Sequence, residues 1–220
     1  MVSVIEVYTT LKNLANKEQK GFITPDVFNS FAGLAQRNII NEMFDELEGN
    51  KRKAQAGQDL PRRRSSYQSV KEDVARYIKS ITSTGTEGIH DIPSDCRKLI
   101  SIKDRDTVVV DMVYDVEVMD YIVSSNLSQP TATFPVALIT SAIETSPEIA
   151  SAKIVYYRNP SVNPQLATGP NNTFDTLNSV DFDIPEDYAS EAVYEIAKLL
   201  GVRLRDQSIQ AFGTQEAQQA

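Results

Sequence analysis

The first third of the chain carries hydrophobic residues at helical spacing. In residues 3–15 they recur every three or four positions, which predicts an amphipathic N-terminal helix. A longer stripe over residues 25–48 predicts a long helix whose wide apolar face requires more than one packing partner. Gly49 and Asn50 are candidates to end this helix, although the polar continuation leaves its end open. Residues 67–78 predict a third, shorter helix.

The residues around Pro25 predict where the long helix starts. Thr24 is a good N-cap, Pro25 suits the first helical position, and Asp26 complements the helix dipole. Ile23 and Phe28 occupy the two positions of a hydrophobic staple. The same stretch resembles part of an EF-hand loop, but the lysine and valine at ligand positions argue against calcium binding.

The middle of the chain is rich in β-branched residues and is interrupted by turns, which favours strands. We expect a short helix at 116–126 and strands at 97–103, 107–113, 136–144 and 151–160. A long loop rich in Asn, Pro and Gly follows at 161–181. Pro185 opens another helical segment, and Gly201 is placed to stop it.

These elements predict an α+β fold, with long N-terminal amphipathic helices and C-terminal helices around a small, mostly antiparallel β-sheet or sandwich. We expect one compact fold in four segments. They are a helical subdomain (1–80), a β-rich subdomain (81–160), a long loop (161–184), and a C-terminal helix with a flexible tail (185–220).

Charge is distributed unevenly in this acidic chain. The formal net charge is −8 and the isoelectric point is about 4.8, which argues against a global nucleic-acid-binding surface. One basic cluster stands out: Lys51, Arg52, Lys53, Arg62, Arg63 and Arg64. It is either a solvated loop or an electrostatic contact with an acidic partner or nucleic acid. Tyr67 is the one aromatic residue nearby, so base recognition is disfavoured.

Residue types that carry catalysis are scarce. The chain has one histidine, His90, and one cysteine, Cys96, and no nucleotide-binding or nucleophile motif. A Cys–His dyad and a metal site on the aspartates are the alternatives considered; those aspartates are Asp91, Asp95, Asp104, Asp106 and Asp111. Their spacing is typical of turns and strand edges. We therefore expect no enzyme, no cofactor and no metal.

Membrane and export signals are also missing from the pattern. No apolar run approaches membrane-spanning length, and the first residues lack the features of a signal peptide. We expect a soluble protein made in a cytoplasm, without membrane insertion.

An ordered set of segments resembles a known family. The segments are GFITPDVFNSFAGLAQRNIINEMFDEL, DIPSDCRKLISI, SQPTATFPVALITSAIETSP, SAKIVYYRNP and DFDIPEDYASEAVYEIAKLLGVRLRDQSI. Together, over about residues 5–210, they resemble the ring or adaptor proteins of the head-to-tail connector and tail of tailed bacteriophages, as in crAss-like podoviruses. The basic segment KRKAQAGQDLPRRR is not among the features that carry the resemblance. It leaves open which ring of the stack this would be.

The resemblance implies a virion structural protein without a small-molecule substrate. About twelve copies would form a homo-oligomeric ring below the portal protein, assembled in the host cytoplasm and bound to adjacent tail ring proteins. Genomic DNA would pass through without sequence specificity, because acidic walls do not hold phosphates. The oligomer-interface candidates are Phe28, Phe31, Leu34, Ile40, Met43, Phe44 and Leu47. The loop 161–181 and the tail 207–220 are expected to order on docking.

Three alternatives remain open at the level of sequence. The first is a nucleic-acid-binding packaging or assembly protein that acts through residues 51–64. The second is a metal-dependent enzyme that uses the aspartates. The third is another virion role, such as fibre attachment or head decoration.

Overall fold

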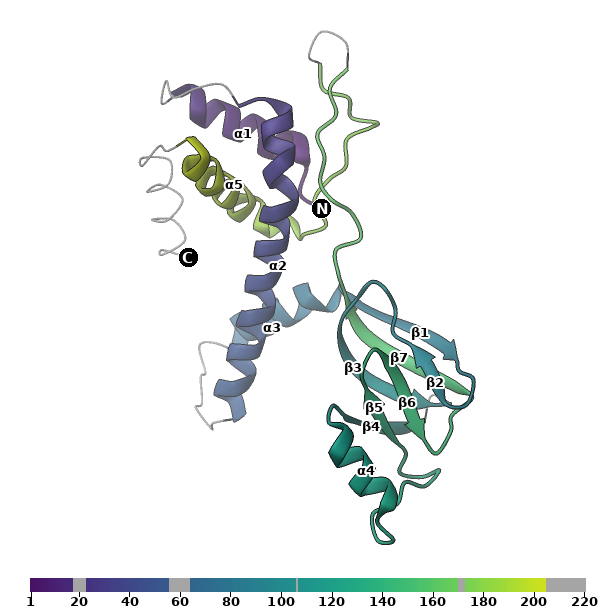
Figure 1. Ribbon diagram of the computed structural model, residues 1–220. Coiled ribbons are helices and arrows are strands. Elements are labelled where there is room, and N and C mark those ends of the chain that lie inside the picture. Colours follow the sequence, from purple (N-terminus) through teal and green to yellow (C-terminus); the bar gives the residue numbers. More distant parts are fainter. Residues whose placement is uncertain (18–22, 56–63, 106, 170–172, 205–220) are drawn as a thin grey trace. The chain divides into compact units, whose positions relative to one another are not determined.

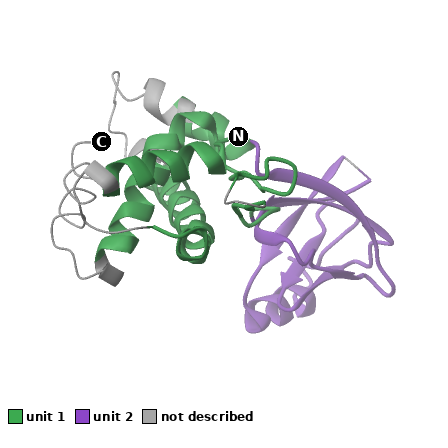
Figure 2. Ribbon diagram, turned by 90° about the horizontal axis from the view of Figure 1, so that it is seen from above, with its two compact units in different colours: residues 1–75, 160–220 green, residues 76–159 purple. Residues whose placement is uncertain are grey.

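The computed structural model describes residues 1–17, 23–55, 64–105, 107–169 and 173–204 (Figure 1). The chain divides into two compact units (Figure 2). We call residues 1–75 with 160–220 the helical unit, and residues 76–159 the sheet unit. The predicted mixture of helices and strands is confirmed.

The helical unit is built on one long helix. Its described helices are α1 (Val4–Lys17), α2 (Pro25–Gln55), α3 (Arg64–Ala75), the short 3₁₀ helix η2 (Glu186–Tyr188) and α5 (Ala189–Leu204). α2 packs against α3 and α5, and α5 also packs against α1. Between α2 and α5, the Asn38 amide donates to a carboxylate oxygen of Glu195 over 2.6 Å. The wide apolar stripe of α2 therefore has several partners within its own chain.

The start of α2 follows the sequence prediction. The Thr24 hydroxyl accepts a hydrogen bond from the Val27 amide at 3.4 Å, so Thr24 caps the helix. Ile23 and Phe28 are both buried, as a hydrophobic staple requires. Tyr8 of α1 donates its hydroxyl proton to the Ile23 carbonyl at 2.8 Å and packs edge-on against Phe28. Residues of α1 thus fix the entry into α2.

The sequence left the end of α2 open, and two other predicted helix ends were wrong. α2 continues through Gly49 to Gln55, and α5 continues through Gly201 to Leu204. A glycine inside a helix costs only about 1 kcal/mol relative to alanine, which neighbouring turns can outweigh. The helix predicted for 67–78 ends at Ala75, because the β-branched run that starts at Ile78 forms a strand.

The sheet is larger than the small sheet we predicted. Its seven strands are β1 (Ile78–Thr84), β2 (Ile89–Asp91), β3 (Cys96–Asp104), β4 (Val108–Val113), β5 (Val136–Ile139), β6 (Ala142–Ser146) and β7 (Ser151–Arg158). They lie in the order β1-β7-β3-β4-β5-β6-β2 and curve into a nearly closed barrel. All neighbours are antiparallel except β4 and β5, so the predicted mostly antiparallel pairing is confirmed. Our prediction from the sequence did not include β1 and β2, and it treated β5 and β6 as one strand.

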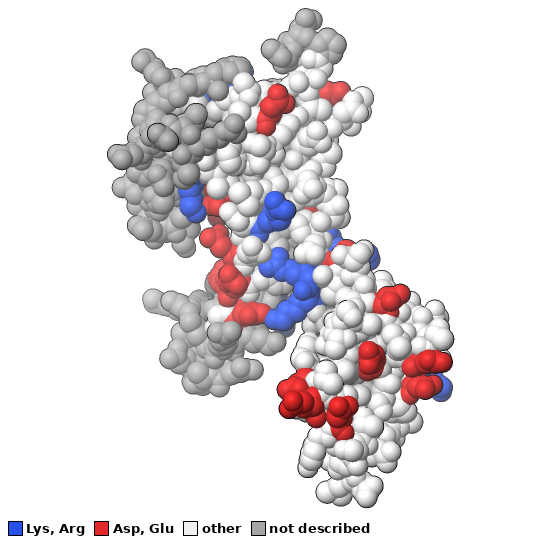
Figure 3. Space-filling model, viewed as in Figure 1, with Lys and Arg blue, Asp and Glu red and all other residues white. Residues whose placement is uncertain are grey.

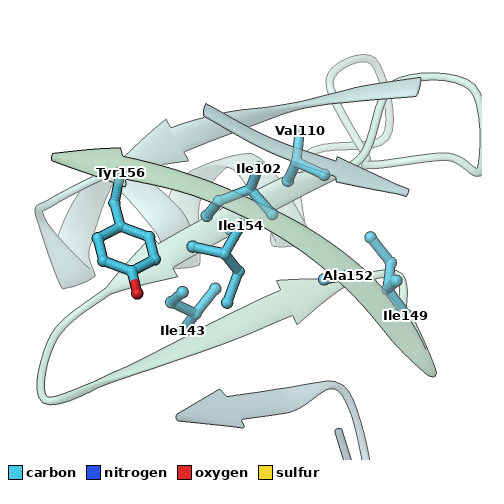
Figure 4. Close-up of a cluster of buried hydrophobic side chains, with 8 residues drawn as sticks. Ile102, Val110, Ile143, Ile149, Ala152, Ile154 and Tyr156 are labelled. Atoms are coloured by element: carbon cyan, nitrogen blue, oxygen red, sulfur yellow. The ribbon is translucent and has the colours of Figure 1, made fainter. Parts of the chain in front are cut away.

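The interior of the barrel is apolar (Figure 4). Along β7, Ala152, Ile154 and Tyr156 are buried at alternate positions, as expected for a strand with one face to the core. Ile102 of β3 and Ile143 of β6 lie in the same cluster. This core stabilises the barrel, and the connection between β4 and β5 starts and ends on that barrel.

The long loop is held to the helices by side-chain amides. Asn29 of α2 donates to the Leu166 carbonyl and accepts from the Leu166 amide, at 3.0 and 2.8 Å. Buried Gln36 donates to the Val162 carbonyl at 2.8 Å and accepts from the Asp183 amide at 2.7 Å. The described parts of the loop thus have hydrogen-bond partners on α2, and ordering of the loop on docking remains a prediction.

Candidate protein-interaction surface

Exposed large hydrophobic side chains are concentrated on one part of the sheet unit. Within the described residues, seven of the fifteen exposed large hydrophobics fall between residues 114 and 134. They are Tyr114, Val116, Val118, Tyr121, Val123, Leu127 and Phe134. We call this set the α4 surface. Single exposed apolar residues are ordinary, whereas a cluster of them is typical of an interaction site.

Helix α4 (Val116–Ser124) at the centre of this surface belongs to the connection between the parallel strands β4 and β5. Parallel neighbours require such a crossover, so the topology of the sheet fixes where the helix starts and returns. Asp115 caps the helix by accepting from the Glu117 amide at 2.9 Å.

Only one side of α4 is covered by the sheet. Met119 is 8 % exposed and packs with Val136 and Leu138, and Ile122 lies against the same cluster. Positions 119 and 122 are three apart and share a face of the helix. The other apolar residues of α4 therefore extend beyond the face that its own unit buries.

A helical projection divides the uncovered part of α4 into apolar and acidic stripes. Val118 and Tyr121, three positions apart, lie on one flank, and Tyr121 is 73 % exposed. Glu117 and Asp120, also three apart and both exposed, share the outward stripe. A partner that covers α4 would therefore meet apolar contact area beside two carboxylates.

The flanking residues of the surface sit on ordered turns. The Ser125 hydroxyl accepts from the amides of Leu127 and Ser128, at 3.3 and 3.2 Å, which positions Leu127 at 96 % exposure. Thr131 and Phe134 exchange two backbone hydrogen bonds, at 3.2 and 3.0 Å. The backbone below both protruding side chains is thus held by its own turn, which lowers the backbone entropy lost on binding.

The sequence on both sides of α4 carries charge of one sign. Residues 106–152 contain seven acidic residues and no lysine, arginine or histidine. Figure 3 shows acidic side chains on the visible face of the sheet unit. The α4 surface is therefore apolar and acidic, and the complementary partner surface is apolar and basic.

The predicted interface stripe on α2 is divided by the structure. Phe28, Ile40, Met43 and Phe44 are buried within the chain, where they form part of the core of the helical unit. Leu34 is exposed, and Phe31 and Leu47 are partly exposed. The interface assignment remains a prediction, and without rearrangement of the core it rests on these last three side chains.

The predicted basic cluster is placed only in part. Lys51, Arg52 and Lys53 belong to the last turns of α2, and Arg64 is the first residue of α3. Arg62 and Arg63 lie outside the described residues.

The aspartates considered as metal ligands are spread over different strands and turns. Asp91 is in β2, Asp104 ends β3 and Asp111 is in β4, while Asp106 lies outside the described residues. Among the residues that the structure describes, no three His, Cys, Asp or Glu side chains gather in a way that could hold a metal ion.

Asp95 takes part in a network that joins β1 and β7. It accepts from the Lys79 ammonium at 2.7 Å and from the Tyr156 hydroxyl at 2.8 Å. The hydrogen bond from Lys79, followed by that from Tyr156, lowers the pKa of Asp95. Burial of Tyr156 and its bond to Asp95 raise the pKa of that phenol. These bonds tie neighbouring strands together, which gives Asp95 a structural role.

His90 and Cys96 have different surroundings. His90 is buried, and its Nε2 donates to the Ile149 carbonyl at 2.9 Å, because a carbonyl can only accept. Its Nδ1 has no hydrogen-bond partner in the described structure. Gly85 lies against the ring, and a Cβ there would be 2.8 Å from His90 Cε1. Burial raises the pKa of the Cys96 thiol, which disfavours the nucleophilic thiolate.

No protein-family model matches this sequence, and no curated protein matches it. A membrane-spanning helix is not found either, since none of the described helices combines the necessary length and apolarity.

Proposed function

We propose that this chain is a virion structural protein that forms an oligomeric ring of the phage neck or tail below the portal. The ring would line the channel for DNA ejection and dock further tail components. The observation that carries the proposal is the α4 surface, where seven large apolar side chains stand exposed on ordered backbone. Such a surface is suited to a permanent protein partner, since leaving it in water favours association.

An interface of this kind can build a ring. A head-to-tail contact joins one patch of a subunit to a different patch of the next, and it closes when the rotation per subunit divides a full turn. The α4 surface would be one such patch, and the exposed part of α2 is a candidate for contact with a neighbour. The acidic net charge supports passage of DNA, because the walls would not bind the phosphate backbone.

The proposal is tested by counting copies in particles. Gradient-purified virions are digested, and this chain and the portal protein are quantified by mass spectrometry against labelled peptide standards. A ratio near one supports a ring matched to the portal. Absence of the chain from the particles contradicts the proposal and favours the role in packaging or assembly that acts through residues 51–64.

A further inference from the structure

We propose that the α4 surface docks the basic segment Lys51–Arg64 of a second copy of this chain. This inference rests on the proposed function and identifies one contact by which the ring would be built. It joins an acidic region of the molecule that lacks basic residues to a basic segment.

The charges of the two regions are complementary. Residues 106–152 carry seven acidic and no basic residues, and segment 51–64 carries six basic residues and one acidic residue, a formal charge of +5. Opposite local charges on two patches raise the rate of encounter and select the orientation of docking. They also disfavour contact between two α4 surfaces or between two basic segments.

The apolar character of the regions is complementary as well. The α4 surface offers Tyr121, Leu127 and Phe134 beside Glu117 and Asp120. The basic segment carries Leu60 and Pro61 directly before its three arginines. An apolar pair next to arginines matches an apolar surface next to carboxylates, and arginine in turn is favoured against tyrosine rings and carboxylates.

The two patches differ from each other and are present in every copy. A contact between them can repeat head to tail, and such a heterologous contact is the type that builds a ring. A symmetric dimer would make the same contact twice, and it differs from a ring in mass.

The test uses two charge-reversed full-length chains. One carries Glu117→Lys and Asp120→Lys, and the other carries Arg62→Glu and Arg63→Glu. Alone, each variant places like charges at two positions of the proposed contact, so we expect its self-association to weaken by about tenfold or more. Mixed in equal amounts, the two variants restore opposite charges at every contact, and association should return.

Sedimentation velocity at low salt measures the association, and circular dichroism confirms that each variant is folded. The matched control is Glu144→Lys with Glu148→Lys, two exposed acidic residues of the same region outside α4. This control changes the charge of the region by the same amount away from α4, so it should weaken association much less than Glu117→Lys with Asp120→Lys. All association should weaken as salt rises, because exposed charges are screened.

Two results overturn the inference. One is a lack of concentration-dependent association of the unmodified chain up to about 100 μM. The other is a mixture that associates no better than its separate components. If the arginine variant instead loses salt-sensitive DNA binding and the mixture stays monomeric, the basic segment is a nucleic-acid site.

The particle count separates this inference from the proposed function. A ratio near one to the portal, together with a failed charge exchange, keeps the ring and removes this contact. A successful exchange in a protein that is absent from virions keeps the contact and removes the phage role.

Discussion

At the scale of single residues, side-chain amides on α2 take the place of missing backbone partners. Asn29 and Gln36 each supply one donor and one acceptor to the loop that follows the sheet unit. Asp183 completes the arrangement by accepting from the amide and hydroxyl of Ser161, at 2.9 and 3.0 Å. An unpaired buried polar group costs about 1–3 kcal/mol, so these residues have a large effect on the helical unit.

Replacing Gln36 tests this account. Gln36→Leu keeps the approximate volume but leaves the Val162 carbonyl and the Asp183 amide without their partner. We expect the free energy of unfolding in urea to fall by about 2–4 kcal/mol. The control is Gln68→Leu on the exposed surface of α3, which should change it by less than about 0.5 kcal/mol. An equal effect of the two substitutions would contradict the structural role of Gln36.

Glu42 makes the stability of the helical unit depend on pH. Partial desolvation of its carboxyl, although the residue as a whole is exposed, raises the pKa of Glu42, and the nearby Glu195 carboxylate raises it further. The folded state then binds this proton more tightly than the unfolded state. Stability from Glu42 is therefore present at low pH and is lost as the pH rises through the raised pKa.

We expect Glu42→Gln to raise the thermal midpoint at pH 7 by about 1 °C. The advantage should disappear as the pH falls below the range in which free glutamate ionises, because the unmodified side chain is then also neutral. Thermal melts from pH 3.5 to 7.5 measure the difference, with Glu144→Gln as an exposed control. A variant that gains stability only in acid would show that the sign is wrong.

At the scale of elements, α4 behaves as a connector with two functions. Met119 and Ile122 attach it to the sheet, and the rest of its apolar residues remain uncovered. The outer residues should therefore be dispensable for folding, although they are hydrophobic.

A pair of substitutions separates the two sides of α4. Met119→Ala opens a cavity and should lower the free energy of unfolding by about 2–3 kcal/mol. Tyr121→Ser with Leu127→Ser should leave it within about 0.5 kcal/mol of the unmodified chain. Urea denaturation followed by circular dichroism measures both. A large loss from the outer pair would mean that these side chains stabilise the fold itself.

The elements also show what a sequence can specify. The start of α2 was predictable because Thr24, Pro25 and the pair Ile23 and Phe28 act locally. Strand β1 was missed because its Ile, Ser and Thr residues stand next to a helix and are stabilised by distant pairing with β7.

The α4 surface could not be recognised from periodicity. The apolar residues of α4 look like core residues, and only the tertiary structure shows which of them the sheet covers. The charge pattern could have indicated this surface, since residues 106–152 contain acidic residues and no basic residue. Periodicity also did not show that α2 packs against α3 and α5, and the interface role of its stripe remains a prediction.

At the scale of the whole molecule, the helical unit and the sheet unit each have their own core. The net charge of −8 is unevenly distributed, since residues 106–152 form an acidic region and residues 51–64 form a basic segment. We interpret this division as a means for identical chains to recognise each other in one orientation. The account therefore makes the α4 surface necessary for assembly and unnecessary for folding.

The most direct test is incorporation into particles. The chain with Tyr121→Ser and Leu127→Ser is supplied in place of the unmodified chain during phage growth, and its ratio to the portal protein is measured in purified virions. We predict a ratio near one for the unmodified chain and at least a tenfold lower ratio for the variant, although the variant is folded. Equal incorporation of the two chains would contradict the claim that the α4 surface is the assembly interface.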